Sequence, residues 1–137
     1  MPAVSVSLWY VLLAAAVQMV LGSLWYSKVL FAKPWMESIG RKVEDIGKPG
    51  PEMVLMALGA LITAYVLAHF VAFAAAKTVM LGLETGVWAW LGFVLPVTGG
   101  IKLFEQRSTT WFAITAGYYL VGLMVMGAIL ANHAHLV

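Results

Sequence analysis

Four long stretches of this sequence contain no Asp, Glu, Lys or Arg, and they decide what the chain can fold into. They are Val4 to Tyr26, Met53 to Ala76, Gly86 to Ile101 and Thr110 to Ala131. A helix needs roughly 20 apolar residues to cross about 30 Å of hydrocarbon. Because each stretch is apolar on every side rather than along one stripe, a soluble domain of 137 residues could not bury all four. The sequence therefore predicts a membrane protein.

The predicted fold is all-α, with the whole chain, 1–137, forming one bundle of four membrane-spanning helices. We expect the spans to cover about 4–26, 53–76, 85–103 and 110–131. Composition agrees, since 63% of the residues are hydrophobic and 10% are charged, against about 45–50% and about 25% in soluble domains. The first stretch has no positive segment before it and is too long for a secretory signal, so we expect it to remain as a span.

The basic residues of the connections predict the orientation of the bundle. Lys102 and Arg107 lie between the third and fourth spans, and only Lys77 lies between the second and third. The others lie between the first and second spans, at Lys28, Lys33, Arg41, Lys42 and Lys48. Basic residues concentrate in cytoplasmic loops. We therefore expect the loops 27–52 and 103–109 to face the cytoplasm and both termini to lie outside.

The first connection also contains a short helical pattern. Pro34 suits the first turn of a helix, where its missing N–H has no intrahelical partner to lose. Apolar residues then recur at three- and four-residue steps, at Met36, Ile39, Val43 and Ile46. This spacing places them along one helix face. We predict an amphipathic interfacial helix over about 34–46 that lies on the membrane surface.

Alanines recur every fourth residue through the second predicted span, at Ala60, Ala64, Ala68, Ala72 and Ala76. Because lipid provides no hydrophobic drive between helices, close approach over small residues supplies much of their contact energy. This alanine stripe therefore predicts close packing against another helix. Two partners fit: a neighbouring span of the same chain, or a second copy of the chain in a homodimer.

Pro96 lies near the centre of the third predicted span. A proline there removes the hydrogen bond to the carbonyl of Gly92 and clashes with it, so the helix must kink or open. Transporters use such broken helices to build substrate sites. Many prolines only kink a helix, and both interpretations stay open at this point.

Few polar side chains lie inside the predicted spans. His69 stands out because an ionisable group within the membrane is a candidate functional residue, and Tyr65 lies one turn before it on the same face. Gln18, Thr98 and Tyr118 lie near the midpoints of the other three spans. We expect these residues to turn inward and to form a polar strand that could bind a ligand. The alternative is that His69 only satisfies its ring on a neighbouring helix.

No pattern of catalytic or metal-binding residues is visible in the sequence. The chain has no cysteine, which excludes disulfides and thiolate metal sites. No carboxylate pair lies within a predicted span, and no Ser–His–Asp order or glycine-rich phosphate loop is present. We therefore expect no catalytic residues, no metal, no cofactor and no nucleic-acid partner; the lipid bilayer is the expected surrounding.

Three sequence blocks carry a resemblance to a known family. The first is Gly22-Ser23-Leu24-Trp25-Tyr26-Ser27, continuing through Phe31 to Trp35-Met36, and the later ones are Gly92-Phe93-Val94-Leu95-Pro96 with Phe104-Glu105, and Gly117-Tyr118-Tyr119-Leu120-Val121-Gly122 with Met126-Gly127. Over nearly the whole chain, and in this order, they resemble the bacterial family catalogued as the domain of unknown function seventeen sixty-one. Ala32 and Lys33 depart from its pattern, which often shows glycine and a small residue there. The resemblance implies a small multi-pass protein of the bacterial cytoplasmic (inner) membrane and implies no activity.

Three aromatic residues of the first block suit the membrane interface. Trp25 and Tyr26 close the first predicted span, and Trp35 lies in the predicted surface helix. Amphipathic rings prefer the depth of the lipid headgroups, so we predict that these residues anchor the span. A sharper alternative is an aromatic pocket closed by Phe31, Trp35, Phe104 and Trp111.

Three classes of function fit these observations. The first is a small oligomeric protein that binds or passes a solute or lipid, using the break at Pro96 and the polar residues of the interior. The second is a structural or accessory subunit of a larger membrane complex, docked through the alanine stripe. The third is a lipid-active enzyme, which ranks last because no catalytic constellation is visible. We favour the first class.

Overall fold

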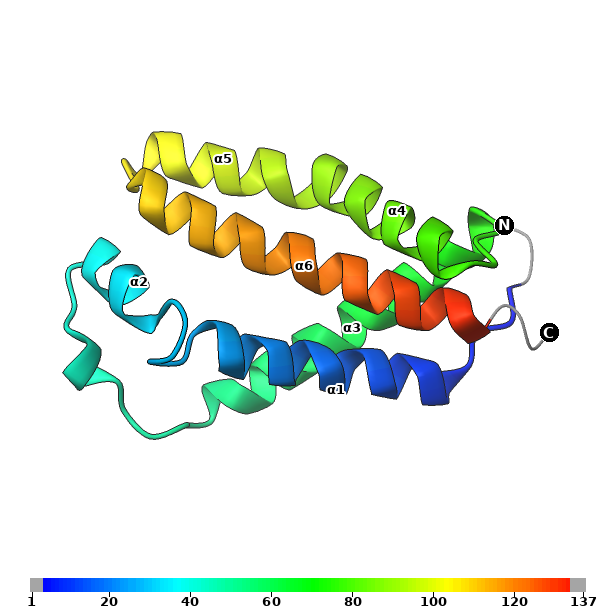
Figure 1. Ribbon diagram of the computed structural model, residues 1–137, viewed down its shortest axis with the longest axis horizontal. Helices are drawn as coiled ribbons and strands as arrows, with labels where there is room; N and C mark the ends of the chain where they lie inside the picture. Colours follow the sequence, from blue (N-terminus) through cyan, green and yellow to red (C-terminus); the bar gives the residue numbers. More distant parts are fainter. Residues whose placement is uncertain (1–3, 134–137) are drawn as a thin grey trace.

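The computed structural model describes residues 4–133, and within that range the chain is helical, without a strand (Figure 1). Four helical segments are long and apolar enough to cross a membrane: Leu8–Trp25, Glu52–Phe73, Val79–Phe104 and Thr109–Asn132. This confirms the predicted all-α membrane fold. The elements are α1 (Leu8–Trp25), α2 (Ala32–Ser38), the 3-10 turn η1 (Val43–Asp45), α3 (Glu52–Phe73), α4 (Val79–Ala89), the π-helical turn η2 (Trp90–Val94), α5 (Leu95–Phe104) and α6 (Thr109–His133).

The other three spans are arranged around α6, which is the fourth. In Figure 1, α4, η2 and α5 follow one another as a single rod along one side of α6, while α1 runs along the other side and α3 crosses behind. The start of α1, the last turns of α6 and the α3–α4 connection share one end of the bundle. The opposite end carries α2, η1 and the α5–α6 connection, and is called the α2 end below.

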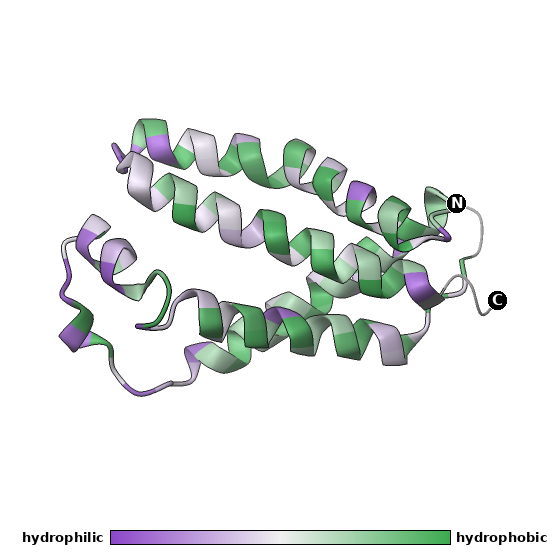
Figure 2. Cartoon of the chain, in the orientation of Figure 1, coloured by the Kyte–Doolittle hydropathy of each residue, from purple (hydrophilic) through white to green (hydrophobic). Residues whose placement is uncertain are grey.

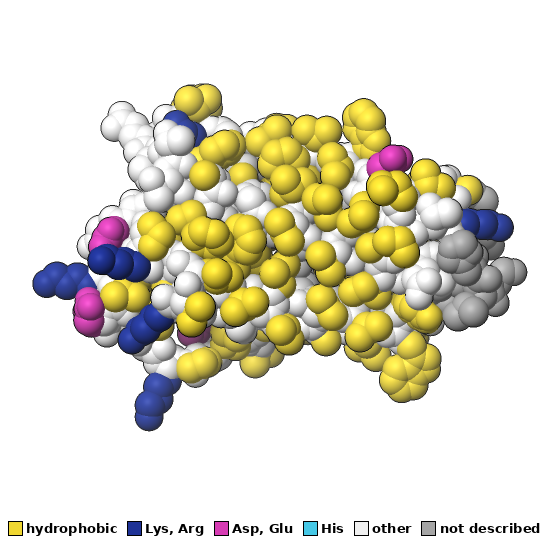
Figure 3. Space-filling model, viewed as in Figure 1, with side chains coloured by type: hydrophobic (Ala, Val, Ile, Leu, Met, Phe, Trp, Pro, Cys, Tyr) yellow, Lys and Arg dark blue, Asp and Glu magenta, His cyan; other side chains and the backbone are white. Residues whose placement is uncertain are grey.

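The surface has the apolar character that a membrane requires. In Figure 2 hydrophobic residues predominate along the four spans, whereas hydrophilic ones gather around α2 and η1. In Figure 3 hydrophobic side chains form a broad band across the middle of the visible face, and most charged side chains lie at the α2 end. Large apolar residues such as Trp88 and Leu55 are 72% and 71% exposed on the spans. In a bilayer these side chains face hydrocarbon rather than water.

The third span begins earlier than the sequence indicated. Thr78 caps the helix, since its hydroxyl oxygen accepts a hydrogen bond from the N–H of Leu81 at 3.2 Å. The segment from Val79 onward, which precedes the predicted span of 85–103, therefore already belongs to α4. Glu84 lies on an exposed side of that helix instead of marking its boundary. The start of the helix is thus set by the capping Thr78 and not by the charge of Glu84.

The expected surface helix is shorter than predicted. α2 ends at Ser38, and Gly40 adopts a φ of +75°, a conformation that glycine reaches without strain. The N–H of Arg41 donates to the carbonyl of Met36, and that of Gly40 donates to the carbonyl of Glu37. This pairing is the Schellman closure of a helix. The remainder of the predicted helix forms only the single turn η1.

The alanine stripe packs inside the chain. Ala60, Ala64 and Ala68 are at most 7% exposed and belong to the main core, where α3 packs on α1 and α6. Ala76, beyond the end of the helix, is also buried, and Ala72 is half-buried. Of the two partners that the sequence left open, the neighbouring spans of the same chain occupy this face.

The closest helix pair is α4 with α6, and glycine makes the approach possible. A Cβ atom on Gly82 would collide with the carbonyl oxygen of Gly127, and one on Gly86 would collide with that of Leu123. Only a residue without a side chain fits where one backbone lies directly against another. This contact fixes the α4–η2–α5 rod along α6.

Candidate functional site

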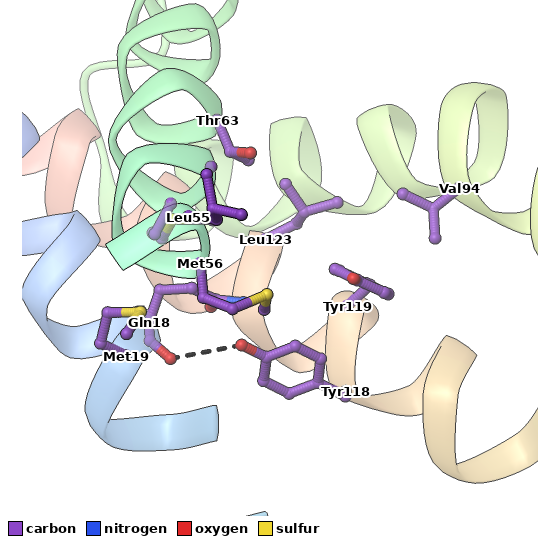
Figure 4. A pocket seen from close by; sticks show the side chains of 12 residues that line it. Gln18, Met19, Leu55, Met56, Thr63, Val94, Tyr118, Tyr119 and Leu123 are labelled. Carbon is purple, nitrogen blue, oxygen red and sulfur yellow. Dashed lines mark hydrogen bonds between the residues drawn. The ribbon is translucent and has the colours of Figure 1, made fainter. Parts of the chain in front are cut away.

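A crevice opens where α3 and α5 separate on the two sides of α6. α3 contacts α4 near the other end of the bundle but diverges from α5 toward the α2 end. The half that carries polar groups, called the polar chamber, has a volume of about 260 Å³. Figure 4 shows its lining from α1, α3, η2 and α6. The lining residues are Gln18, Met19, Leu55, Met56, Gly59, Ala60, Thr63, Val94, Tyr118, Tyr119, Leu123 and Met126.

A second chamber shares part of this lining. Its volume is about 370 Å³, and Thr63, Val94 and Leu123 line both chambers, so they adjoin each other. At its far side the rings of Phe70 and Phe93 stack with their centroids 5.9 Å apart. Apart from the Thr63 hydroxyl all its side chains are apolar, and we call it the apolar chamber. Its lining residues are Ile62, Thr63, Val66, Leu67, Phe70, Ala89, Phe93, Val94 and Leu123.

The break around Pro96 shapes one wall of the crevice. The predicted loss of the hydrogen bond from position 96 coincides with the π-helical turn η2, in which the N–H of Leu95 donates to the carbonyl of Trp90. Val94, in this turn, reaches both chambers, whereas Pro96 itself is exposed on the outside of the rod. The proline therefore affects the crevice by changing the shape of the helix, without lining the crevice itself.

Thr98 forms its hydrogen bonds with the end of the same irregular turn. It is buried, and its hydroxyl donates to the carbonyl of Val94 at 2.8 Å and lies 3.2 Å from that of Leu95. Bonds of this kind to carbonyls three and four residues earlier satisfy a threonine hydroxyl within its own helix. Thr98 is absent from the lining of both chambers.

Gln18 is the buried polar side chain of the polar chamber. Only 6% of it is exposed, and its Oε1 atom is buried and accepts no hydrogen bond from any described residue. Its carboxamide rests directly against the backbone of Gly122, in the space that a Cβ atom would fill. A buried amide oxygen without a partner costs about 1–3 kcal/mol. A ligand that donates a hydrogen bond to this oxygen would remove that cost.

Tyr118 lies beside Gln18 (Figure 4). Its hydroxyl donates to the backbone carbonyl of Gln18 over a long 3.4 Å, and 5% of the residue is exposed. The hydroxyl fits against α1 because Gly22 has no side chain: a Cβ atom there would lie 2.8 Å from it. Gln18 and Tyr118, predicted to share an interior site, are thus brought together.

An aromatic cluster closes the α2 end of this site. The ring of Tyr118 lies 5.4 Å from that of Tyr26, which in turn packs edge-on against Trp35 at 5.2 Å. Trp25 packs against Phe31 at 4.8 Å and donates its indole N–H to the carbonyl of Ile114 at 3.1 Å. Trp25, Tyr26 and Trp35 were predicted as interfacial anchors, and their contacts also join α1 and α2 to α6.

One group in this cluster lacks a partner. The indole Nε1 of Trp35 is buried without a hydrogen bond to any described residue. Burial raises the pKa of Tyr26, which follows the last residue of α1, to about 12. A side-chain hydrogen bond with Thr115 opposes this effect of burial, and the phenol is protonated at neutral pH.

Tyr65 and His69 lie elsewhere, contrary to the expectation of a shared polar strand. Tyr65 is 48% exposed, and the imidazole of His69 lies 4.7 Å from its ring and 6.3 Å from that of Phe73. The Nδ1 atom of His69 lies 2.9 Å from the carbonyl of Tyr65 on the same helix. Since the imidazole is satisfied within one turn of α3, it needs no partner on another span.

Several residues of the site escaped the sequence argument. Met19 and Met56 were indistinguishable from other apolar residues, although methionine is well suited to adaptable binding surfaces. Gly122 has the clearest function, because it makes room for the carboxamide of Gln18. Among the described residues no group of three His, Cys, Asp or Glu side chains could hold a metal ion.

Comparison with known proteins gives one match. The family model described as a protein of unknown function, DUF1761, matches residues 9–131. That range contains every residue that lines the crevice. No curated protein and no solved structure matches the chain.

Proposed function

Because the chain belongs to this family, whose description assigns no activity, we propose a function from the crevice itself: the protein binds a lipid-like molecule within the membrane. The carrying observation is the buried Oε1 atom of Gln18, which accepts no hydrogen bond from the described residues and belongs to a side chain that lines an otherwise largely apolar crevice. A molecule with one polar group and an apolar chain complements both features.

The lining argues for an amphiphile dissolved in the bilayer. Neither chamber is lined by Asp, Glu, Lys, Arg or His, so an ion would enter without a countercharge. Leu55 and Ile62, on the rim, are 71% and 66% exposed on the side that faces hydrocarbon. A ligand therefore reaches the crevice sideways from the lipid, without crossing water.

The role of accessory subunit has less support. Its sequence argument was the alanine stripe, and most of that stripe is buried between spans of the same chain. The stripe is therefore not free to dock a second copy or another protein. We retain lipid binding as the proposed function.

Obstructing the crevice tests this proposal. Thr63 lines both chambers, and Thr63→Trp places a bulky ring where they adjoin, while Leu58→Trp places the same ring on an exposed position of α3 outside the lining. Native mass spectrometry of protein extracted from its membrane in mild detergent should show a bound lipid in the wild type and in Leu58→Trp. Thr63→Trp should lose it. Equal retention in all three proteins would contradict binding in the crevice.

We further propose that the α2 end faces the cytoplasm of a bacterial inner membrane. The support is the excess of basic residues at that end. Lys42 and Lys77 are both exposed and belong to opposite ends of the bundle. In intact cells an impermeant thiol reagent should label Lys77→Cys and spare Lys42→Cys. Labelling of Lys42→Cys alone would reverse the orientation and leave lipid binding unaffected.

A further inference from the structure

The polar group of the ligand can be defined more closely from the chemistry of Gln18. A carboxamide has an acceptor oxygen and donor N–H groups, and the torsion that orients it is soft. Rotation about this torsion turns either edge toward the polar chamber, which Gln18 lines. A ligand that both donates to Oε1 and accepts a hydrogen bond satisfies the amide in either orientation.

The hydroxyl of Tyr118 supplies a second contact point. Its hydrogen bond to the backbone carbonyl of Gln18 is 3.4 Å long, which exceeds a good O–H···O hydrogen bond, and the hydroxyl also lies within reach of the Gln18 side chain. It can therefore turn toward a better acceptor in the chamber. One ligand oxygen that carries a hydrogen would accept from Tyr118 and donate to the amide oxygen of Gln18.

Charge excludes the common acidic headgroups. A carboxylate or phosphate in this chamber would lose its hydration and meet no cationic side chain, which is costly in a medium of low dielectric constant. An ether or ester oxygen would accept from Tyr118 but leave Oε1 of Gln18 without a donor. An uncharged hydroxyl meets both requirements.

The apolar chamber supplies the path of the chain. It continues from the polar chamber across Thr63, Val94 and Leu123 and reaches the stacked rings of Phe70 and Phe93. Phe93 is 66% exposed, so an alkyl chain that passes it enters the surrounding hydrocarbon. The ligand chain is therefore free to exceed the length of the crevice.

From these contacts we propose that the ligand is an uncharged long-chain alcohol, with its hydroxyl between Gln18 and Tyr118 and its chain in the apolar chamber. This inference rests on the proposed lipid-binding function and adds the chemical class of the ligand.

Three probes with the same chain test the inference: hexadecanol, its methyl ether and hexadecanoate. Each is added to the full-length protein in phosphatidylcholine nanodiscs, and occupancy is measured by native mass spectrometry. Hexadecanol should bind about tenfold more tightly than the ether, as expected for one additional hydrogen bond to a buried group. Gln18→Leu should reduce hexadecanol to the affinity of the ether, whereas Thr85→Val, which removes a hydroxyl bonded within α4, should not.

The outcomes separate the two proposals. Equal binding of all three probes, lost in Thr63→Trp, would overturn the alcohol inference and leave lipid binding intact. Preference for hexadecanoate would also overturn it. Binding of none of the probes above the level of Thr63→Trp would contradict both proposals. The comparison of probes on the wild type does not depend on whether Gln18→Leu folds.

Discussion

The two sides of α6 are packed in opposite ways. Against α4, the backbones touch through Gly82, Gly86 and Gly127, and no space remains for a side chain. Between α3 and the η2–α5 segment, the helices separate and leave two adjoining chambers. Both regions lie within the same bundle and are built from similarly apolar sequences. The difference shows that the position of small residues, more than hydrophobicity, decides where a membrane bundle closes.

The open side also retains the polar atoms that the closed side has no room for. Backbone contact at Gly86 excludes any polar side chain, whereas the open side holds Gln18 with its unpaired oxygen. The stability that close packing contributes between α4 and α6 therefore offsets the cost of an unpaired polar atom on the other side of α6. The predictions below test this division, from the largest expected change to the smallest.

The first prediction concerns the closed side. Gly86→Ala places a methyl group on the backbone of α6 at Leu123, and neither backbone can yield without separating the helices. We expect the free energy of unfolding, measured by steric trapping in bicelles, to fall by about 2 kcal/mol. Gly99→Ala is the matched control, because a Cβ atom there meets nothing within 4 Å. If Gly86→Ala proved as stable as Gly99→Ala, the α4–α6 contact would not be the rigid side.

The second prediction applies the same substitution to the open side. In Gly122→Ala the new methyl meets the flexible end of the Gln18 side chain rather than a backbone. Gln18 can swing into the polar chamber, so the loss of unfolding free energy should be smaller, about 1 kcal/mol. The displaced carboxamide should obstruct the ligand. Lipid occupancy in native mass spectrometry should therefore fall more in Gly122→Ala than in Gly86→Ala; the reverse order would place the ligand elsewhere.

Much of the fold followed from the sequence for a physical reason. Hydrocarbon imposes length and apolarity on every span, and these properties are readable residue by residue. The start of the third span was missed because the uncharged stretch begins only after Glu84, although Thr78 caps a helix that includes this residue. This error also hid Gly82 and Gly86, whose spacing of four residues indicates close helix packing.

The site was only partly predictable, because burial depends on which face each helix turns inward. Gln18 and Tyr118 were placed inside correctly, since lipid offers neither a partner. The same argument failed for Tyr65, which is exposed. The long 3.4 Å hydrogen bond of Tyr118 and the space above Gly122 depend on distances between helices, which no single sequence supplies.

The third prediction compares two tryptophans of the aromatic cluster. Trp25→Phe removes an indole N–H that donates to the carbonyl of Ile114, whereas Trp35→Phe removes one that has no partner among the described residues. Hydrogen bonds between membrane helices contribute roughly 0.6 kcal/mol on average. Trp25→Phe should therefore destabilise the protein by about that amount more than Trp35→Phe, measured in the same steric-trapping assay. A larger loss in Trp35→Phe would reveal a partner for its indole, such as a lipid headgroup.

The smallest effect is expected at His69, the histidine of the apolar second span. On its outward face of α3, the imidazole lies along the helix between the rings of Tyr65 and Phe73 and is satisfied by the carbonyl of Tyr65. His69→Phe exchanges one ring for another on that face, and the freed carbonyl still accepts the hydrogen bond of the helix ladder. We expect the free energy of unfolding to change by less than about 0.5 kcal/mol and lipid occupancy to stay at the wild-type level.

Gln18→Leu should lower that occupancy in the same experiment, because the carboxamide that it removes lines the crevice. Loss of the ligand in His69→Phe but not in Gln18→Leu would move the binding site to the outer face of α3 and leave the crevice without a function.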